Sequence, residues 1–314
     1  MKPKIVHILN HCSTGGLPTY ALKRVEALKN DYDIFVIEYQ NLSDEYVIHR
    51  KKFQAILSDN YFILGEDKLD LLKIIAKIDP DFIIFEEIPE LFCHLDYAKL
   101  IYSKRNRKYK IIECTHTSTF DTKNKIFLPD KFLFVSKYSQ DQYKHFNIPS
   151  EVIEYPVEKI TVTTEDKSSA LKELKLNPAQ KHIVITGLFT PNKNQKYAFD
   201  LARRLDNKYQ FHFLGNLAPN FKDYWEPLLK NKPQNCIIHG ETDKVDIFLK
   251  AADLFLFPSL LELNPIALKE AISFDLKCLI YKLPTYSNCY DLNPNIKYLS
   301  GYVSIDSSKI KILV

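Results

Sequence analysis

The chain has 314 residues, of which 46% are hydrophobic and 26% are charged, and its formal net charge is +4. This composition is that of a soluble globular protein, and no apolar run approaches the ~18 residues that a membrane-spanning helix needs. The positive charge is too small and too scattered to indicate a nucleic-acid partner.

The length suits two α/β domains of ordinary size, each with its own hydrophobic core. The sequence begins with MKPKIVHILNHC, a short apolar run that lacks the long apolar region and the cleavage site of a signal peptide. We therefore expect a cytoplasmic protein, and the mild positive charge would also allow peripheral association with the acidic inner face of the membrane. The six cysteines form no C-x-x-C pair and four lie in or beside apolar runs, so we expect reduced, mostly buried thiols.

Short β-branched runs alternate with helical stretches along the whole chain, which predicts parallel sheets with right-handed crossovers. The predicted strands of the first half are 5–9, 34–39, 61–64, 82–85, 110–114 and 132–135. Those of the second half are 182–186, 210–214, 236–239, 254–257 and 277–281. Residues 156–180 lack strong periodicity and predict a linker with an entry helix, so we expect domains at 1–155 and 181–314.

Glycine is scarce, and most of the glycines follow predicted strands: Gly15, Gly16, Gly187, Gly215 and Gly240. In open α/β sheets, ligands bind outside the carboxyl ends of the strands, although a tight turn explains any single glycine equally well. The pattern predicts two Rossmann-like domains with ligand-binding mouths that face each other across a cleft. The motif G-x-G-x-x-G is absent, which counts against a dinucleotide-dependent dehydrogenase.

The most informative segment is FPSLLELNPIALKEAIS, residues 257–273. A buried strand leads into a loop that carries Glu262, and a helix is predicted to begin with Asn264 as its N-cap and Pro265 at its first position. The free amides of that helix would attract a phosphate or a sugar oxygen, and Glu262 and Glu270 could accept hydroxyl hydrogens. The alternative is that Glu262 only favours the helix start and that Glu270 faces solvent.

This segment resembles the paired-glutamate motif of the retaining glycosyltransferases of the GT-B fold, in particular their large fourth family. A second segment, TGLFTPNKNQ at residues 186–195, is similar to the loop whose lysine grips the donor phosphates in that family, and Lys193 takes the place of that lysine. The resemblance covers nearly the whole chain and is strongest for 183–283. In the first half it rests on the Gly15-Gly16 loop, on His116 and on FLFVSKYS at residues 132–139.

The resemblance implies that the second domain binds a nucleotide-sugar donor such as a UDP- or GDP-sugar. Glu270 would bind the ribose, Lys193 would meet the diphosphate, and Glu262 and the amides near Ile266 would contact the transferred sugar. The donor-site residues implied in this way are Gly187, Lys193, Glu262, Asn264, Pro265, Ile266 and Glu270.

From the first domain, the resemblance implies that His116 and the Gly15-Gly16 loop face the reacting centre. The catalytic residues would then be His116 and Glu262, and the acceptor side would include Gly15, Gly16 and Glu87. Considered alone, His116 is equally well a strand-end histidine with a structural hydrogen bond. Glu86 and Glu87 are equally well helix caps or solvated charges.

We expect no metal and no cofactor, because no Asp-x-Asp pair occurs at the first domain's strand ends or in the phosphate loop, and the histidines and cysteines form no ligand pattern. A lysine and a helix N-terminus would stabilise the departing nucleoside diphosphate in place of a metal. This chemistry agrees with the metal-free reaction that the resemblance implies.

The expected function is therefore transfer of a hexose-type sugar, with retention, to a glycan, lipid-linked or protein acceptor in surface polysaccharide or glycoconjugate biosynthesis. Two features depart from the family. Leu188 stands where an arginine usually follows the glycine, and the chain ends at Val314, before the usual long closing helices. They leave two alternatives: a degenerate GT-B protein that binds a sugar nucleotide or a partner without turnover, and a nucleotide-sugar epimerase.

Overall fold

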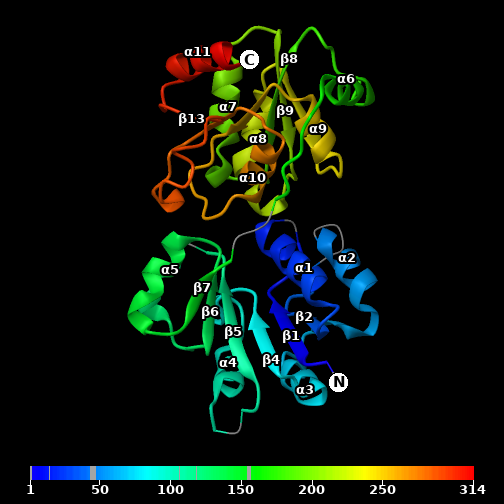
Figure 1. Cartoon of the computed structure of the whole chain (residues 1–314), viewed down its shortest axis with the longest axis vertical. Coiled ribbons are helices and arrows are strands. Elements are labelled where there is room, and N and C mark those ends of the chain that lie inside the picture. The colour runs from blue at the N-terminus through cyan, green and yellow to red at the C-terminus, as the bar shows by residue number, and fades with distance from the viewer. Residues whose placement is uncertain (1, 14, 43–46, 106, 118, 154–156) are drawn as a thin grey trace. The chain divides into compact units, whose positions relative to one another are not determined.

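The computed structural model describes the chain except for residues 1, 14, 43–46, 106, 118 and 154–156. It divides the chain into two compact units, Met1–Tyr155 and Pro156–Val314. Each unit is a parallel sheet with helices on both faces (Figure 1). The strand order is β3-β2-β1-β4-β5-β6-β7 in the first sheet and β10-β9-β8-β11-β12-β13 in the second. Both sheets therefore have the order of Rossmann-like domains, which confirms the α/β class.

The first unit contains strands β1 (Lys4–Leu9), β2 (Asp33–Glu38), β3 (Tyr61–Ile63), β4 (Phe82–Phe85), β5 (Lys110–Thr115), β6 (Lys131–Phe134) and β7 (Ser150–Val152). Its α-helices are α1 (Gly16–Leu28), α2 (Ile48–Leu57), α3 (Asp70–Ile78), α4 (Leu95–Tyr102) and α5 (Lys137–Tyr143). Helices α1 and α2 pack on one face of the sheet, and α3 and α4 pack on the other.

The second unit contains strands β8 (Lys181–Thr186), β9 (Tyr209–Leu214), β10 (Cys236–Gly240), β11 (Leu254–Phe257), β12 (Cys278–Ile280) and β13 (Ile296–Tyr298). Its α-helices are α6 (Thr164–Glu173), α7 (Gln195–Ala202), α8 (Lys222–Lys230), α9 (Val245–Ala251), α10 (Ile266–Ser273) and α11 (Val303–Leu313). Helices α7 and α11 belong to one face, and α9 and α10 to the other.

The cores form because these strands are apolar on both faces, as parallel strands between helix layers must be. Strand β11, with the sequence LFLF, is buried along its whole length, and Phe255 and Phe257 are at most 1% exposed. Each phenylalanine buried in this way stabilises the fold by about 1.5–3 kcal/mol relative to an exposed side chain. Among the described residues no helix is long and apolar enough to cross a membrane.

Every run predicted as a strand forms one, with ends shifted by at most one residue. The two strands that the sequence pattern missed, β7 and β13, are three-residue strands at the edges of their sheets. Strand β7 is mostly exposed, and β13, although its Ile296 is buried, is too short to form an apolar run. Helix α6 lies in the segment predicted as linker and entry helix, and a capping box between Thr163 and Asp166 fixes its start.

In a sheet with this strand order, the connections leave in opposite directions at the switch point, which opens a crevice at the carboxyl ends of the two central strands. The switch point lies between β1 and β4 in the first unit and between β8 and β11 in the second. The loops that follow these four strands contain most of the residues singled out from the sequence.

Candidate functional site

At the switch point of the second unit, two glycines let the loops after β8 and β9 approach each other. A Cβ on Gly187 would lie 3.3 Å from the side chain of Lys193, and one on Gly215 would lie 2.2 Å from the carbonyl oxygen of Gly187. Both glycines have positive φ, 131° and 149°. Because no side chain fits at Gly215, the loops after β8 and β9 touch, and the Lys193 side chain lies across Gly187.

Lys193 ends the short 3₁₀ helix Pro191–Lys193, whose start is capped by the hydroxyl of Thr190. Its ammonium group forms a salt bridge with the carboxylate of Glu262, from the loop after β11, and lies 5.3 Å from the centre of the Phe257 ring. The side chains of Lys193 and Glu262 are 29% and 11% exposed. Two residues predicted separately for phosphate and sugar thus meet, and solvent reaches the pair.

The Glu262 loop is held in place on both sides. The amide of Leu260 donates to the carbonyl of Asn192 at 2.8 Å, and the hydroxyl of Thr285 donates to the carbonyl of Glu262. The loop after β11 is therefore tied to the 3₁₀ helix that carries Lys193. This geometry can offer an ammonium group and a carboxylate to one ligand.

Helix α10 follows this loop, and its residues 266–268 supply amides that lack partners within the helix. The prediction that Asn264 is the N-cap was wrong: Pro265 is the N-cap, and its fixed ring leaves the helix without a side-chain cap. The uncapped amides remain suited to an anion. Glu270 is half-buried on the same helix, while Leu268 and Ala271 anchor the helix in the core.

Two buried hydroxyl groups complete this edge of the sheet. The Oγ1 of Thr186, at the end of β8, and the Oγ of Ser259, just after β11, are buried and have no hydrogen-bond partner among the described residues. A buried polar atom without a partner costs about 1–3 kcal/mol, so such atoms call for a ligand or water. Sequence reasoning missed both, although each is a hydroxyl residue at the carboxyl end of a strand beside the switch point.

In the first unit, the Gly15-Gly16 loop leads into α1. The carbonyl of Gly15 accepts hydrogen bonds from the amide and the hydroxyl of Thr19, and Gly15 has φ 129° with open space where a Cβ would lie. The loop therefore leaves room for a group outside the end of β1. Residue 14, just before it, lies outside the described residues.

Glu86, just after β4, is fully buried and accepts hydrogen bonds from two side chains. Arg24 of α1 donates to both of its oxygens at 3.0 and 3.1 Å, and Nδ1 of His7 donates at 2.6 Å. Burial alone would raise the pKa of Glu86, but Arg24 and His7 outweigh it and hold that pKa at about 2. Glu86 is therefore ionised, and its charge is neutralised inside the unit.

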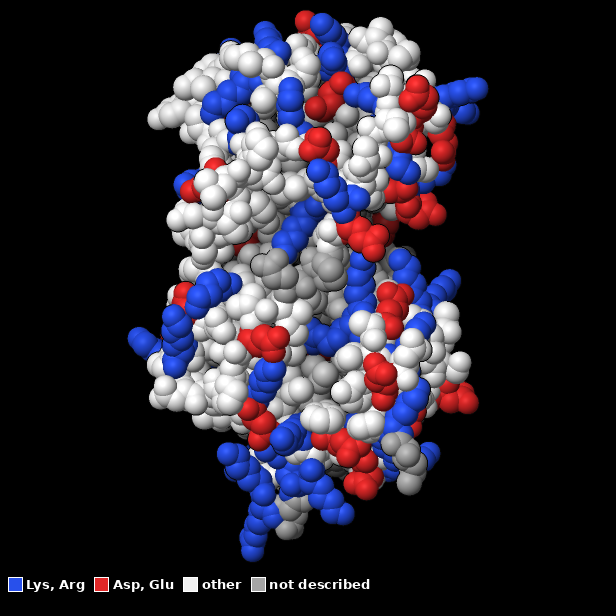
Figure 2. Space-filling model, in the orientation of Figure 1, with Lys and Arg blue, Asp and Glu red and all other residues white. Residues whose placement is uncertain are grey.

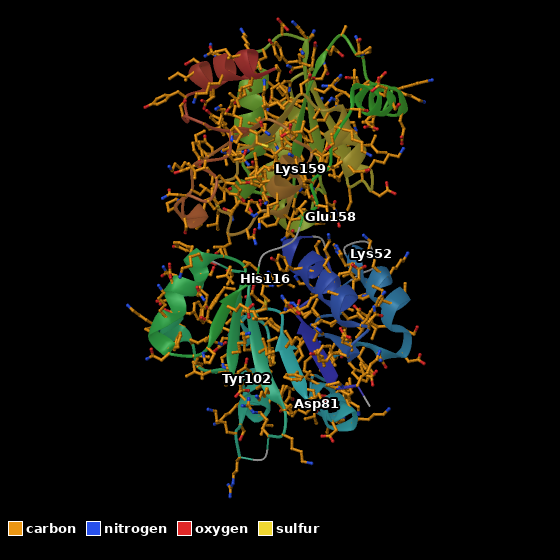
Figure 3. All side chains as sticks on the ribbon, in the orientation of Figure 1. Lys52, Asp81, Tyr102, His116, Glu158 and Lys159 are labelled. Atoms are coloured by element: carbon orange, nitrogen blue, oxygen red, sulfur yellow. The ribbon has the colours of Figure 1, made fainter. Side chains whose placement is uncertain are left out.

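His116 lies beyond the carboxyl end of β5, as Figure 3 shows, and its ring packs edge-on against Tyr20 at 5.6 Å. Burial lowers its pKa, so the imidazole is neutral near pH 7. Its Nε2 lies 3.3 Å from Sγ of Cys114, and the guanidinium of Arg24 donates to that sulfur at 3.2 Å. Burial raises the pKa of the Cys114 thiol to about 12.

These contacts favour one tautomer of His116. The Cys114 sulfur accepts from Arg24 and keeps its own proton. It can donate that proton in a hydrogen bond to the neighbouring Nε2 of His116. The ring then carries its own proton on Nδ1. A neutral imidazole with Nδ1–H can donate one hydrogen bond to a reacting oxygen.

Glu87 was expected to meet the acceptor. Its carboxylate accepts from the amides of Ile88, at 2.9 Å, and His116, at 3.4 Å, and burial raises its pKa. The contact with His116 joins the loops after β4 and β5. Glu87 therefore supports the position of His116, and contact with an acceptor stays a prediction.

Among the described residues, one group has the spacing of metal ligands: Glu86, Cys114 and His116, whose ligand atoms lie within 4.8 Å of one another. Arg24 donates to both Glu86 and Cys114, so its guanidinium already takes the place that a cation would need. The group therefore fits an internal ion pair better than a metal.

A row of three histidines crosses the second sheet and was not predicted. Nδ1 of His182 lies 3.0 Å from Nε2 of His212, and Nδ1 of His212 lies 3.0 Å from Nε2 of His239. Nε2 of His182 faces the carbonyl of Asn177, which can only accept, so each ring in turn must donate from Nε2 and accept at Nδ1. Burial lowers the pKa of all three, and that of His212 to about 3.

Part of the second unit is similar to a known protein family. Residues 166–293 match the family model described as glycosyl transferases group 1. No curated protein matches the chain significantly.

Solved structures match nearly the whole chain. HepE of Anabaena, solved with UDP-glucose, matches with a TM-score of 0.79 and 13% identity over 98% of this chain and 89% of that one. A glycosyltransferase from Rickettsia africae matches with 0.72 and 13% over 99% and 88%. Sucrose-phosphate synthase from Thermosynechococcus elongatus matches with 0.72 and 13% over 99% and 90%. At these identities the similarity shows the fold, which is that of GT-B glycosyltransferases.

Proposed function

We propose that this chain is a retaining glycosyltransferase that moves a hexose-type sugar from a UDP- or GDP-sugar to a glycan, lipid-linked or protein acceptor. The donor occupies the carboxyl edge of the second sheet, and the first unit contributes His116 and the acceptor side. No metal takes part. The product belongs to surface polysaccharide or glycoconjugate biosynthesis.

The observation that carries this proposal is the partly exposed salt bridge between Lys193 and Glu262 at the switch point. A nucleotide-sugar brings a diphosphate, which competes with Glu262 for the ammonium group, and sugar hydroxyls, which the released carboxylate can accept. The unpartnered hydroxyls of Thr186 and Ser259 and the amides of α10 supply further donors to phosphate oxygens.

The chemistry follows from where charge develops. As the bond between the sugar and the diphosphate breaks, negative charge grows on the leaving phosphate, and Lys193 and the α10 amides stabilise it. His116, neutral and carrying its proton on Nδ1, can donate to a sugar or acceptor oxygen without adding a charge. The leaving phosphate takes the acceptor's proton on the same face of the sugar, which gives retention.

A turnover assay tests the proposal. Purified protein is incubated with UDP- and GDP-hexoses, with and without glycan and polyprenyl-phosphate acceptors, and nucleoside diphosphate release and donor configuration are followed. We expect release that depends on acceptor and persists in EDTA. Loss of activity in EDTA with recovery in Mn²⁺ would overturn the metal-free reaction, and conversion of the donor sugar to its epimer without acceptor would make the chain an epimerase.

The two glutamates can be separated by substitution. Glu270→Ala should weaken binding of the nucleoside diphosphate and Glu262→Ala should mainly slow transfer, each by about 10- to 150-fold, as for loss of a charged hydrogen-bond partner. If both variants bind and turn over as the parent does, neither glutamate contributes to donor binding or transfer.

Leu188 favours one second candidate, a binding protein without turnover. It follows Gly187 where the resemblance places an arginine, and its described contact is a carbonyl that accepts from the side chain of Gln195. The site then has one cation fewer for the diphosphate. Tight diphosphate binding without release from any donor would favour this candidate, and Leu188→Arg should then tighten diphosphate binding if the loop has room.

A further inference from the structure

One surface of the first unit carries exposed apolar side chains that nothing in the donor or acceptor chemistry uses. They come from the 3₁₀ helix Pro89–Leu91, from α4 and from the loop before β6. The residues, with their exposed fractions, are Leu91 (52%), Leu95 (47%), Leu100 (61%), Ile126 (62%) and Leu128 (43%). We call this set the α4 surface.

The contacts show that these segments lie side by side. The amides of Ile126 and Phe127 donate to the Glu90 carboxylate at 2.7 and 2.9 Å, next to Leu91. The ring of Phe127 packs 5.3 Å from that of Tyr102 at the end of α4. The loop before β6 therefore runs beside α4, with Phe127 packed inward and its two neighbours Ile126 and Leu128 exposed.

Helix α4 has apolar residues on its outer side as well as on the side that faces the sheet, which is unusual for a helix at the protein surface. Ala98, Ile101 and Tyr102 face the sheet, and Leu95 and Leu100 remain on the outer side. Scattered exposed leucines need no explanation, but apolar residues gathered from three segments mark an interaction surface. The positive charge of the neighbouring loop indicates which partner the surface binds.

The loop that follows α4 is strongly cationic. Its exposed cations are Lys104, Arg105, Lys108 and Lys110, and Lys99 on α4 adds another. Arg107 in the same loop is paired with Asp130. Exposed acids also lie nearby, Asp79 and Asp81 before β4 and Asp96 on α4. In Figure 2, lysine and arginine side chains gather at this lower end of the first unit.

We propose that the α4 surface docks on an anionic lipid bilayer, with the leucines and isoleucine entering the headgroup region and the 104–110 loop binding lipid phosphates. Exposed apolar side chains beside a cationic loop are the combination that an anionic membrane surface attracts. The 104–110 loop precedes β5 and His116 follows that strand, so the cationic loop and His116 lie at opposite edges of the sheet (Figure 3). This inference goes beyond the proposed function and does not depend on it.

Vesicle sedimentation tests the proposal with the full chain. Vesicles of phosphatidylcholine alone are compared with vesicles that also contain about one third phosphatidylglycerol, which gives the vesicle surface a negative charge. The parent should sediment with the anionic vesicles and not with the neutral ones, and raising the salt concentration should weaken binding. Binding to both kinds alike, or to neither, would overturn the proposal.

Two pairs of variants identify the surface. Lys104→Gln with Arg105→Gln should lower partitioning about 30-fold, because each cation near an anionic surface contributes about fivefold. Its control, Arg204→Gln with Lys230→Gln, removes the same charge from exposed positions of the second unit and should bind as the parent does.

Leu95→Ser with Ile126→Ser should also weaken binding, whereas the control Leu292→Ser with Ile312→Ser, at side chains 98% and 81% exposed, should not. Sedimentation velocity of the same variants without lipid checks the rival occupant. If the parent forms a dimer that only the α4-surface variants disrupt, or if each test variant binds vesicles like its control, the surface is not a membrane-docking surface.

Discussion

The two sheets have the same strand order but differ in the polar groups that they bury. The first unit buries several carboxylates against cations that are themselves nearly buried: Glu86 with Arg24, Glu38 with Arg50, and Glu90 and Glu113 with Lys125. The second unit holds the neutral row of His182, His212 and the half-buried His239, and its buried Asp306 is held by hydroxyl and amide donors and by the partly exposed Lys309.

The second unit's salt bridge at the switch point, Lys193 with Glu262, differs from those of the first unit because solvent reaches it. A fully buried pair cannot exchange its partner without leaving a charge unpaired, so it serves structure. A partly exposed pair can exchange its partner for a ligand at small cost. The comparison thus separates residues that stabilise the fold from residues that can bind a ligand.

The largest expected effect is that of Lys125→Met in the first unit. The Lys125 ammonium is fully buried and lies 2.7 Å from carboxylate oxygens of both Glu90 and Glu113. Its removal leaves two buried carboxyl groups without a cation and should destabilise the first unit by about 3–5 kcal/mol. Hydrogen exchange followed by mass spectrometry measures this in peptides of β4 and β5.

Lys131→Met is the matched control, because Lys131 pairs with Glu151 on the surface at 40% and 59% exposure. It should change stability by less than about 1 kcal/mol. Equal effects of the two substitutions would mean that the buried pairs do not hold the first unit together.

The histidine row makes the second unit sensitive to acid. The folded-state pKa of His212 is about 3, below its ordinary value of 6.5. Between these two pH values His212 is protonated in the unfolded chain and neutral in the folded chain. Its contribution to stability is therefore complete at high pH and is lost as the pH falls below about 6.5, amounting to roughly 2 kcal/mol by about pH 5. The single tryptophan, Trp225, lies in this unit, so urea unfolding followed by its fluorescence measures the loss.

His212→Phe sharpens this prediction. Phenylalanine keeps the packing against Phe248, 5.8 Å away, and removes both hydrogen bonds to neighbouring histidines. The variant should be less stable near pH 7 by about 1–2 kcal/mol but should lose less on acidification. An unchanged dependence on pH in the variant would show that His212 does not set the acid sensitivity.

The sequence predicted the sheets well because parallel strands form continuous apolar runs. Glu262 was singled out because it follows such a run and precedes a helix, whereas Lys193 was singled out by the resemblance of residues 186–195 to the phosphate loop of the family. It could not show that they pair, because their meeting depends on the pairing of β8 with β11 and on the hydrogen bond from Leu260 to Asn192, which join segments far apart in sequence. The histidine row was missed for the same reason. His182, His212 and His239 look like isolated strand residues until the register of β8, β9 and β10 brings them together.

A smaller effect concerns the tautomer of His116. Cys114→Ser keeps a hydrogen for Nε2 of His116, whereas Cys114→Ala removes it, so the alanine variant should shift the balance of tautomers by about fivefold, the value of one hydrogen bond. The ¹⁵N chemical shifts of the imidazole, assigned with His116→Gln, measure this directly and need no substrate. A parent protein with its proton on Nε2 would contradict the contact scheme.

The central claim is that the carboxyl edge of the second sheet binds a nucleoside diphosphate through Lys193. Calorimetric titration of the parent, of Lys193→Ala and of Lys196→Ala with UDP, GDP and the matching nucleosides tests it most directly. Lys196 is an exposed lysine of the adjacent helix, paired with Asp200, and serves as the control.

Loss of a charge-assisted contact should weaken diphosphate binding by Lys193→Ala about 10- to 150-fold and leave nucleoside binding nearly unchanged, while Lys196→Ala should behave as the parent does. If Lys193→Ala binds diphosphate and nucleoside as the parent does, the phosphate site lies elsewhere and the account fails.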